Sequence, residues 1–306
     1  MRLKVSPADI EKEINAAIQQ EEFDDARMYL HIAKNHQYPI DVERYTHIIR
    51  QKDTRLARLV KNASEFANGF ATGKSSSAAG IAGAVGADFT VVGDVRDLHH
   101  EYNKMEQGEA VNELIVALSG VGIGFTALTL SSMGTAAPAK SGISVIKLAA
   151  KTRRLSSRFQ KHLLRQGKKV FDWDLFTRLL KEARQSKSLA KGLKQIPRAA
   201  RQAYHPKAVE PLKAIAKQVN NVRKSTSVAD TLHLLKYVEN SDDLRRLEKV
   251  SVKYGTQTKG IVKLLGKGAI RTVRVLRKTA ELMLSLFSSL LSAMFSVFFL
   301  FVRRTV

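Results

Sequence analysis

The sequence contains no cysteine among its 306 residues. Disulfide bonds, zinc sites with thiolate ligands and cysteine nucleophiles are therefore excluded. The chain also lacks the GxSxG, HExxH and GxGxxG patterns of serine hydrolases, zinc peptidases and dinucleotide-binding folds. These absences predict a protein that is not an enzyme, with no catalytic residue, no metal ligands and no cofactor.

A glycine-rich stretch at residues 69–77, GFATGKSSS, is one residue too short for a phosphate-binding loop. Gly69 and Gly73 enclose three residues, whereas the loop needs four to curl its backbone N–H groups around a phosphate. The preceding segment has apolar residues at helical spacing, so no buried strand leads into it. We therefore interpret the stretch as the glycine-rich exit from a helix.

Strand patterns are also scarce, because apolar and polar residues alternate over a useful length only in "FTVVG". The sequence thus predicts an all-α fold. Its first helix should begin at Ser6-Pro7 with Asp9, a typical N-terminal cap. We expect a helical, adaptor-like domain at residues 1–68, a glycine-rich helical hairpin at 69–140, a basic helical region at 141–256, and a basic amphipathic helix with a membrane anchor at 257–306.

Acidic residues are few in the middle of the chain. Residues 140–236 carry 24 Lys and Arg against five Asp and Glu, and the whole chain has a formal charge of +23. Such a block attracts a polyanion, which could be an anionic membrane surface, a nucleic acid or an acidic protein. The N-terminus becomes polar before an apolar run can form, so we expect no cleaved secretory signal.

The longest run without charge lies at residues 282–302, with 21 residues. As a helix this run would be about 31 Å long, which matches a hydrocarbon core of about 30 Å. Leu, Phe and Met occupy every face of such a helix, with only Ser between them. This pattern predicts a C-terminal transmembrane helix.

A basic stripe precedes this segment, with cations mostly three or four residues apart on a helix whose other positions are apolar. The pattern predicts a helix lying on anionic lipid, and the positive-inside rule places this side in the cytoplasm. The predicted membrane-surface residues are Lys259, Lys263, Lys267, Arg271, Arg274, Arg277 and Lys278.

Small residues recur at four-residue spacing in the stretch 75–139, which allows two helices to approach closely. The predicted packing positions are Gly80, Gly83, Gly86, Gly120 and Gly124. An acidic turn at 94–113 separates a first arm from an uncharged second arm at 114–139. The hairpin could insert into a membrane, or it could be a tightly packed soluble or re-entrant hairpin.

Three carboxylates in this stretch are candidate functional groups. Asp88 would be a costly charge inside a membrane arm and would need a partner. Asp94 is expected to cap a helix after Gly93, with Asp97 near the positive end of that helix. The segment "DFTVVGDVRD" from Asp88 to Asp97 resembles the "DF…GD..D" signature in the pre-toxin regions of bacterial polymorphic toxins, although the usual proline is missing.

These patterns favour a bacterial, helical protein anchored in the inner membrane, with most of its chain in the cytoplasm and its basic region on anionic lipid. One alternative, implied by the resemblance, is a membrane-inserting, pore-forming-type toxin or effector. Another is a membrane-tethered nucleic-acid-binding protein, although the basic block lacks the interleaved aromatics of single-strand binders. A second copy of the chain is a further candidate partner.

Overall fold

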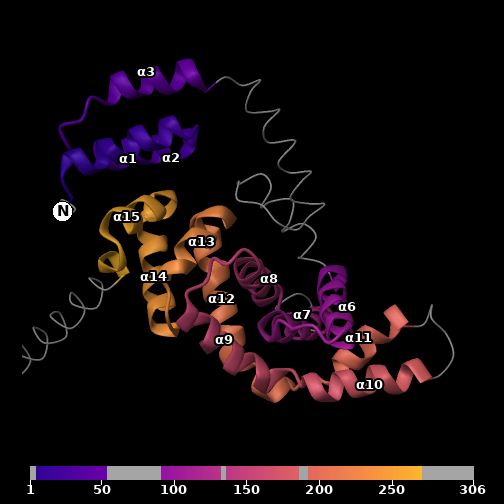
Figure 1. Cartoon of the computed structure of the whole chain (residues 1–306). Helices are drawn as coiled ribbons and strands as arrows, with labels where there is room; N and C mark the ends of the chain where they lie inside the picture. The colour runs from indigo at the N-terminus through magenta and orange to yellow at the C-terminus, as the bar shows by residue number, and fades with distance from the viewer. Residues whose placement is uncertain (1–4, 54–90, 132–135, 186–191, 271–306) are drawn as a thin grey trace, which may run out of the picture.

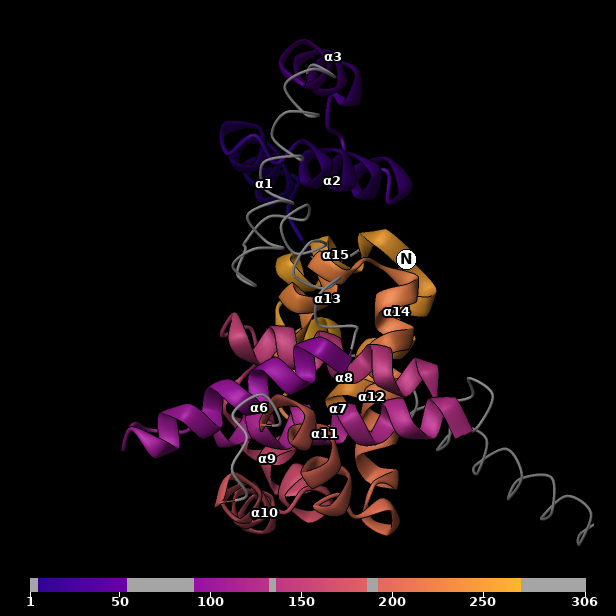
Figure 2. The same cartoon turned by 90° about the vertical axis from the view of Figure 1, so that its right-hand side faces the viewer.

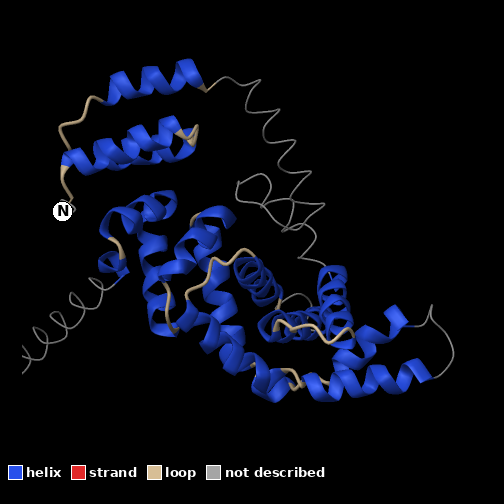
Figure 3. Cartoon of the chain, in the orientation of Figure 1, coloured by secondary structure: helices blue, strands red, loops and turns tan. Residues whose placement is uncertain are grey.

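The computed structural model describes residues 5–53, 91–131, 136–185 and 192–270. Within these ranges the chain is helical and forms no strand (Figure 3). A single antiparallel bridge joins Phe171 to Tyr204. The all-α prediction is therefore confirmed for the described part of the chain.

Figure 1 labels the described helices along the chain. Their bounds are α1 Pro7–Gln19, α2 Phe23–Asn35, α3 Val42–Lys52, α6 Val91–Glu106, α7 Glu113–Ser131, α8 Ala137–Lys151, α9 Ser157–Val170, α10 Trp173–Gln185, α11 Gly192–Gln202, η2 Pro206–Ala208, α12 Glu210–Ser225, α13 Val228–Leu234, η3 Leu235–Tyr237, α14 Ser241–Tyr254, η4 Gly255–Gln257 and α15 Thr258–Leu265.

The first helix begins as predicted. The Ser6 side chain accepts a hydrogen bond from the Asp9 backbone N–H, the Asp9 carboxylate returns one, and Pro7 occupies the first turn. This reciprocal cap satisfies N–H groups that have no partner inside the helix. Helices α1, α2 and α3 pack in sequence order, and α2 also contacts α15.

Helix α7 lies at the centre of the described fold. It contributes Leu118, Val121 and Phe125 to the larger hydrophobic core, which α7 shares with the N-terminal helices, α8, α9 and α12–α15. Its Val116 and Ile123 belong to a second core with α6, α10 and α11. Because α7 is enclosed by other helices, it has no need of a polar face.

The predicted second arm, which carries no charge, therefore lies largely inside the protein as α7. The arm was predicted as one segment at 114–139, but α7 ends at Ser131 and α8 begins at Ala137. Among the described residues, no helix is both long enough and apolar enough to cross a membrane. The predicted packing of the two arms stays a prediction, because the first arm up to residue 90 and the segment 282–302 lie outside the described residues.

The region predicted as an acidic turn is mostly a helix. Helix α6 runs without interruption through Val92 and Gly93 to Glu106, so the predictions that Gly93 ends an element and that Asp94 caps the next one are wrong. The acidic residues do not mark a loop because several of them are paired with lysines of the neighbouring helices, as described below.

The remaining helices cover α7 and α8. Helix α12 packs against α8 and α14, and α13 contacts both α8 and α15. Ser227 caps α13, because its side chain accepts a hydrogen bond from the Asp230 backbone N–H. Figure 2 shows α6 to α12 as one group of crossing helices, with α13 to α15 between them and the N-terminal helices.

Candidate functional site

Two helices carry complementary rows of charge that meet across α7. On α6, Asp94 and Asp97 are three residues apart. On α8, Lys140, Lys147 and Lys151 are spaced by seven and four residues. Residues at these spacings share one face of a helix, so each row presents its charges in a single direction.

The rows form a ladder of ion pairs. Lys140 and Lys147 both bind the Asp94 carboxylate, with Lys147 Nζ 2.7 Å from Asp94 Oδ1. Lys147 Nζ also lies 2.8 Å from Asp97 Oδ2, and Lys151 Nζ lies 2.8 Å from the same oxygen. Lys147 is 0% exposed and Asp94 is 1% exposed. These five residues are called the buried charge cluster below.

Gly122 of α7 makes room for the cluster. A Cβ atom at this position would lie 2.4 Å from Asp94 Oδ2, closer than any real contact of this kind. The carboxylate therefore rests directly on the α7 backbone. The missing side chain lets the lysines of α8 reach Asp94 past the central helix.

The lysines of the cluster favour the charged form of Asp97. Burial alone would raise the pKa of Asp97, but Lys147 and Lys151 lower the pKa of this carboxyl below its usual value. A carboxyl held charged in this way is a poor general acid near neutral pH. The ion pairs tie α6 to α8.

The ladder continues towards the end of α6. Glu101 accepts hydrogen bonds from Lys104 Nζ, at 3.1 Å, and from the Asn112 backbone N–H, at 2.7 Å. The second bond ties α6 to the start of α7. In turn, Asn112 Oδ1 accepts from the Ile115 N–H at 3.2 Å and caps α7.

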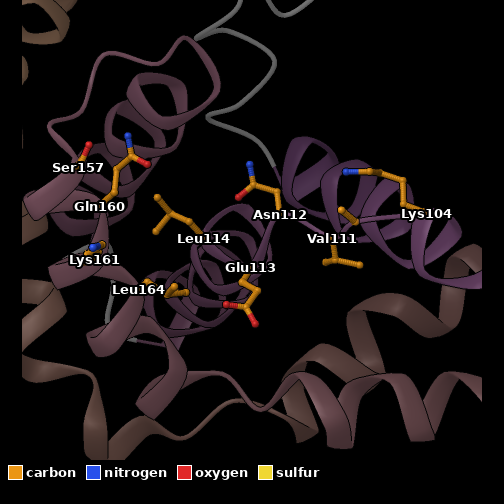
Figure 4. A pocket seen from close by; sticks show the side chains of 10 residues that line it. Lys104, Val111, Asn112, Glu113, Leu114, Ser157, Gln160, Lys161 and Leu164 are labelled. Carbon is orange, nitrogen blue, oxygen red and sulfur yellow. The ribbon is translucent and has the colours of Figure 1, made fainter. Parts of the chain in front are cut away.

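A pocket of about 650 Å³ lies beside this cap, between the α6–α7 connection and α9 (Figure 4). Leu114 and Leu164 form its apolar wall, and Ser157 provides the one hydroxyl group among its lining residues. No histidine lines it, and its charged lining residues are Lys104, Glu113 and Lys161. In addition, no three His, Asp or Glu side chains in the described part of the chain are placed to hold a metal ion.

The predicted packing glycines of α7 face aromatic rings. A Cβ atom at Gly120 would lie 2.2 Å from the Phe171 ring, and one at Gly124 would lie 2.3 Å from the Tyr204 ring. These positions allow close approach, as predicted, but the partner is the bridge between α9 and α11. The other predicted positions, Gly80, Gly83, Gly86 and Asp88, lie outside the described residues.

The predicted membrane stripe is interrupted. Gly266 ends α15 with φ of +58°, a left-handed conformation that favours glycine. The prediction of one continuous helical stripe is therefore wrong. The remaining members of that stripe, Arg271, Arg274, Arg277 and Lys278, lie outside the described residues.

The three described members of the stripe are engaged within the protein. Lys259 Nζ lies 2.6 Å from Asp25 Oδ2, Lys263 Nζ lies 2.8 Å from Glu13 Oε2, and Lys267 binds Glu239. The first two pairs dock α15 against α1 and α2. These lysines thus have protein partners in place of lipid phosphates.

Sequence reasoning missed Lys140, Lys147 and Lys151 as members of a site, because they were counted as part of the basic block at residues 140–236. The signal was present. Ser144 completes a run of small or basic residues at spacings of four, three and four on one α8 face, opposite an acidic row of similar spacing on α6. A search for complementary rows on neighbouring helices would have found the pair.

Comparisons with protein-family models, with curated proteins and with solved structures find no match to this chain. The function must therefore be argued from the residues themselves.

Proposed function

We propose that the protein is a non-enzymatic bacterial membrane protein whose C-terminal segment anchors a basic helical body to the cytoplasmic face of the inner membrane. One observation carries the proposal: residues 282–302 contain no charge over 21 positions. An apolar segment of this length must be removed from water to be stable, and a bilayer is the solvent that matches it.

The described body supports this reading because it buries its own apolar surface. Among its large hydrophobic side chains, only Val92 and Val252 stand out as exposed, at 73% and 69%. They lie on α6 and α14 and form no extended patch. Burial of the apolar side chains inside the described body is consistent with a separate apolar environment for residues 282–302.

The charge of the body supports attraction to anionic lipid. The block at residues 140–236 contains 24 basic and five acidic residues. Each basic residue close to an anionic leaflet contributes about 1 kcal/mol of binding free energy. A body of this kind would remain near the leaflet into which its anchor inserts.

Deletion of residues 280–306 tests the proposal. The full-length chain should stay in the membrane pellet after a sodium carbonate wash, and the truncated chain should be released. A control chain in which residues 282–302 are replaced by an unrelated apolar helix of equal length should stay in the pellet. A full-length chain that is soluble without detergent would contradict the proposal.

Cells that express the full-length or the truncated chain also distinguish a membrane-anchored protein from a pore-forming-type toxin. An anchored, non-enzymatic protein should leave the membrane potential of the expressing cell unchanged. Loss of potential on expression, measured with a voltage-sensitive dye and absent for the truncated chain, would favour the toxin.

A further inference from the structure

Helix α9 carries the strongest one-sided basic surface in the described part of the chain. Its sequence, SRFQKHLLRQGKKV, contains five cations and no acid. Phe159, Leu163, Gly167 and Val170 are buried. The basic residues Arg158, Lys161, Arg165, Lys168 and Lys169, called the α9 basic face below, are all exposed.

At 100° per residue the α9 basic face occupies only about a third of the helix circumference. This sector lies opposite the buried apolar residues, which pack towards α7 and α12. The cations therefore share the side of α9 that is opposite its buried residues, as in a helix that lies on a charged surface.

Three of these cations have no acidic partner in the described structure. Arg158 Nη1 lies 2.9 Å from Glu239 Oε2, and Lys168 Nζ lies 2.9 Å from Glu113 Oε2. No such pair forms at Lys161, Arg165 or Lys169. These three differ in this respect from Lys259, Lys263 and Lys267, which bind acidic residues of the protein.

The α9 basic face begins near the point where the chain departs towards residues 282–302. Glu239 binds both Arg158 at the start of α9 and Lys267 just after α15. Residues 271–281 then lead to the apolar segment, and eleven residues span at most about 40 Å. Helix α9, with 14 residues, is itself about 21 Å long. The face is therefore within reach of any bilayer that the segment enters.

We infer that the α9 basic face is the surface through which the body contacts anionic phospholipid headgroups, with Lys161, Arg165 and Lys169 as the cations available to the lipid. This inference rests on the proposed function, because the anchor brings the face to the bilayer. A nucleic acid is the less favoured occupant, since no aromatic side chain accompanies the exposed cations for stacking on bases.

The test uses the full-length chain in vesicles and exploits the absence of cysteine. Ser157 is exposed one turn before Lys161, and Gln51 is exposed at the end of α3. A fluorophore on Ser157→Cys should be quenched by nitroxide-labelled headgroups in vesicles that contain phosphatidylglycerol, and not in vesicles of phosphatidylcholine alone. A fluorophore on Gln51→Cys should not be quenched in either.

The triple variant Lys161→Gln, Arg165→Gln, Lys169→Gln should weaken this contact about 100-fold, because each charge contributes about 1 kcal/mol, or about fivefold. A matched control, Lys12→Gln, Lys34→Gln, Arg50→Gln, removes three exposed cations from the N-terminal helices and should leave the quenching unchanged. Both variants should remain in the pellet after carbonate extraction, because neither touches residues 282–302.

The outcomes separate the two proposals. Release of the unmodified chain by carbonate would contradict the proposed anchor. Quenching at position 157 would still measure the contact between α9 and the lipid headgroups. Carbonate resistance without quenching at position 157, or an equal loss in both triple variants, overturns the inference about α9. Binding of duplex DNA or RNA that only the α9 variant abolishes, without quenching by lipid, would assign the face to a nucleic acid.

Discussion

The backbone of Gly122 lies directly beneath the carboxylate of Asp94, so that a Cβ atom added to the glycine would lie 2.4 Å from Asp94 Oδ2. This contact brings the central helix α7 and the buried charge cluster together. It implies that the packing of α7 and the pairing of Asp94 with the lysines of α8 depend on each other.

Replacing Gly122 with Ala should lower the free energy of unfolding by about 1–3 kcal/mol, because the new methyl group must displace Asp94 or shift α7. Chemical denaturation followed by circular dichroism measures the loss. Gly268→Ala is the matched control, since a Cβ atom there meets nothing within 4 Å. Equal stabilities for Gly122→Ala and the unmodified chain would contradict the packing.

Removing one member of the buried charge cluster should cost more than removing two. Asp94→Leu removes the carboxylate that Lys140 and Lys147 both bind and should destabilise the fold by about 3–5 kcal/mol, whereas Asp94→Leu combined with Lys147→Met should recover part of that loss. A double-mutant cycle measures the coupling.

An exposed ion pair provides the control for that cycle. The side chains of Lys168 and Glu113 are 57% and 56% exposed, so Lys168→Met should change stability by less than about 1 kcal/mol. Additive effects of Lys147→Met and Asp94→Leu would show that the two side chains do not interact.

His233 should make the fold less stable in mild acid. Burial, with Lys259, Lys236, Arg154 and Lys263 nearby, lowers the pKa of His233 from 6.5 to about 4. The unfolded chain therefore takes up a proton as the pH falls through 6.5, while the folded chain does not until about pH 4. Stability should decrease between these values and level off below them.

Nuclear magnetic resonance titration of His233 checks this directly, and the midpoint should lie well below 6.5. The variant His233→Leu should remove the corresponding slope of stability against pH. A titration midpoint near 6.5 for His233 in the folded chain would contradict the expected environment.

Lys259 should hold the N-terminal helices to the rest of the fold. Its ammonium group lies 2.6 Å from Asp25 Oδ2 and 3.6 Å from Asp230 Oδ1, and its side chain is 17% exposed. Lys259→Met should therefore reduce the hydrogen-exchange protection of α2 about tenfold or more, as expected for a lost charged hydrogen bond of about 1.5–3 kcal/mol.

Lys263→Met is the matched control, because its pair with Glu13 is more exposed and should contribute less. If the two variants had the same effect on α2, the partial burial of Lys259 would not matter to the docking. Unchanged protection in Lys259→Met would show that apolar contacts, such as those of Gly260 with Ile32, dominate the interface.

Local sequence signals predicted the elements well, and long-range relationships less well. The cap formed by Ser6 and Asp9 was readable because all its atoms lie within one turn. The burial of α7 was not, since an apolar run without charge is typical both of a core helix and of a membrane arm. Only the three-dimensional contacts of α7 with its neighbours distinguish the two.

The partners of the charged residues were likewise not predictable from local sequence patterns. The spacing of Lys259, Lys263 and Lys267 indicated a lipid-facing stripe, but the structure places acidic residues of α1, α2 and the η3–α14 connection against them. The sequence shows the angular positions of charges on one helix, and it does not show which helix faces them. For that reason Asp94 and Asp97 were recognised as unusual while their lysine partners were not.

Sidedness of the chain tests the central claim most directly. Single cysteines at Gln107, which is exposed after α6, and at Thr305, beyond the apolar segment, can be labelled with a membrane-impermeant maleimide in intact spheroplasts and in inverted vesicles. The account predicts that Thr305→Cys is labelled only in spheroplasts and Gln107→Cys only in inverted vesicles. Labelling of both positions from the same side would contradict a membrane-spanning anchor.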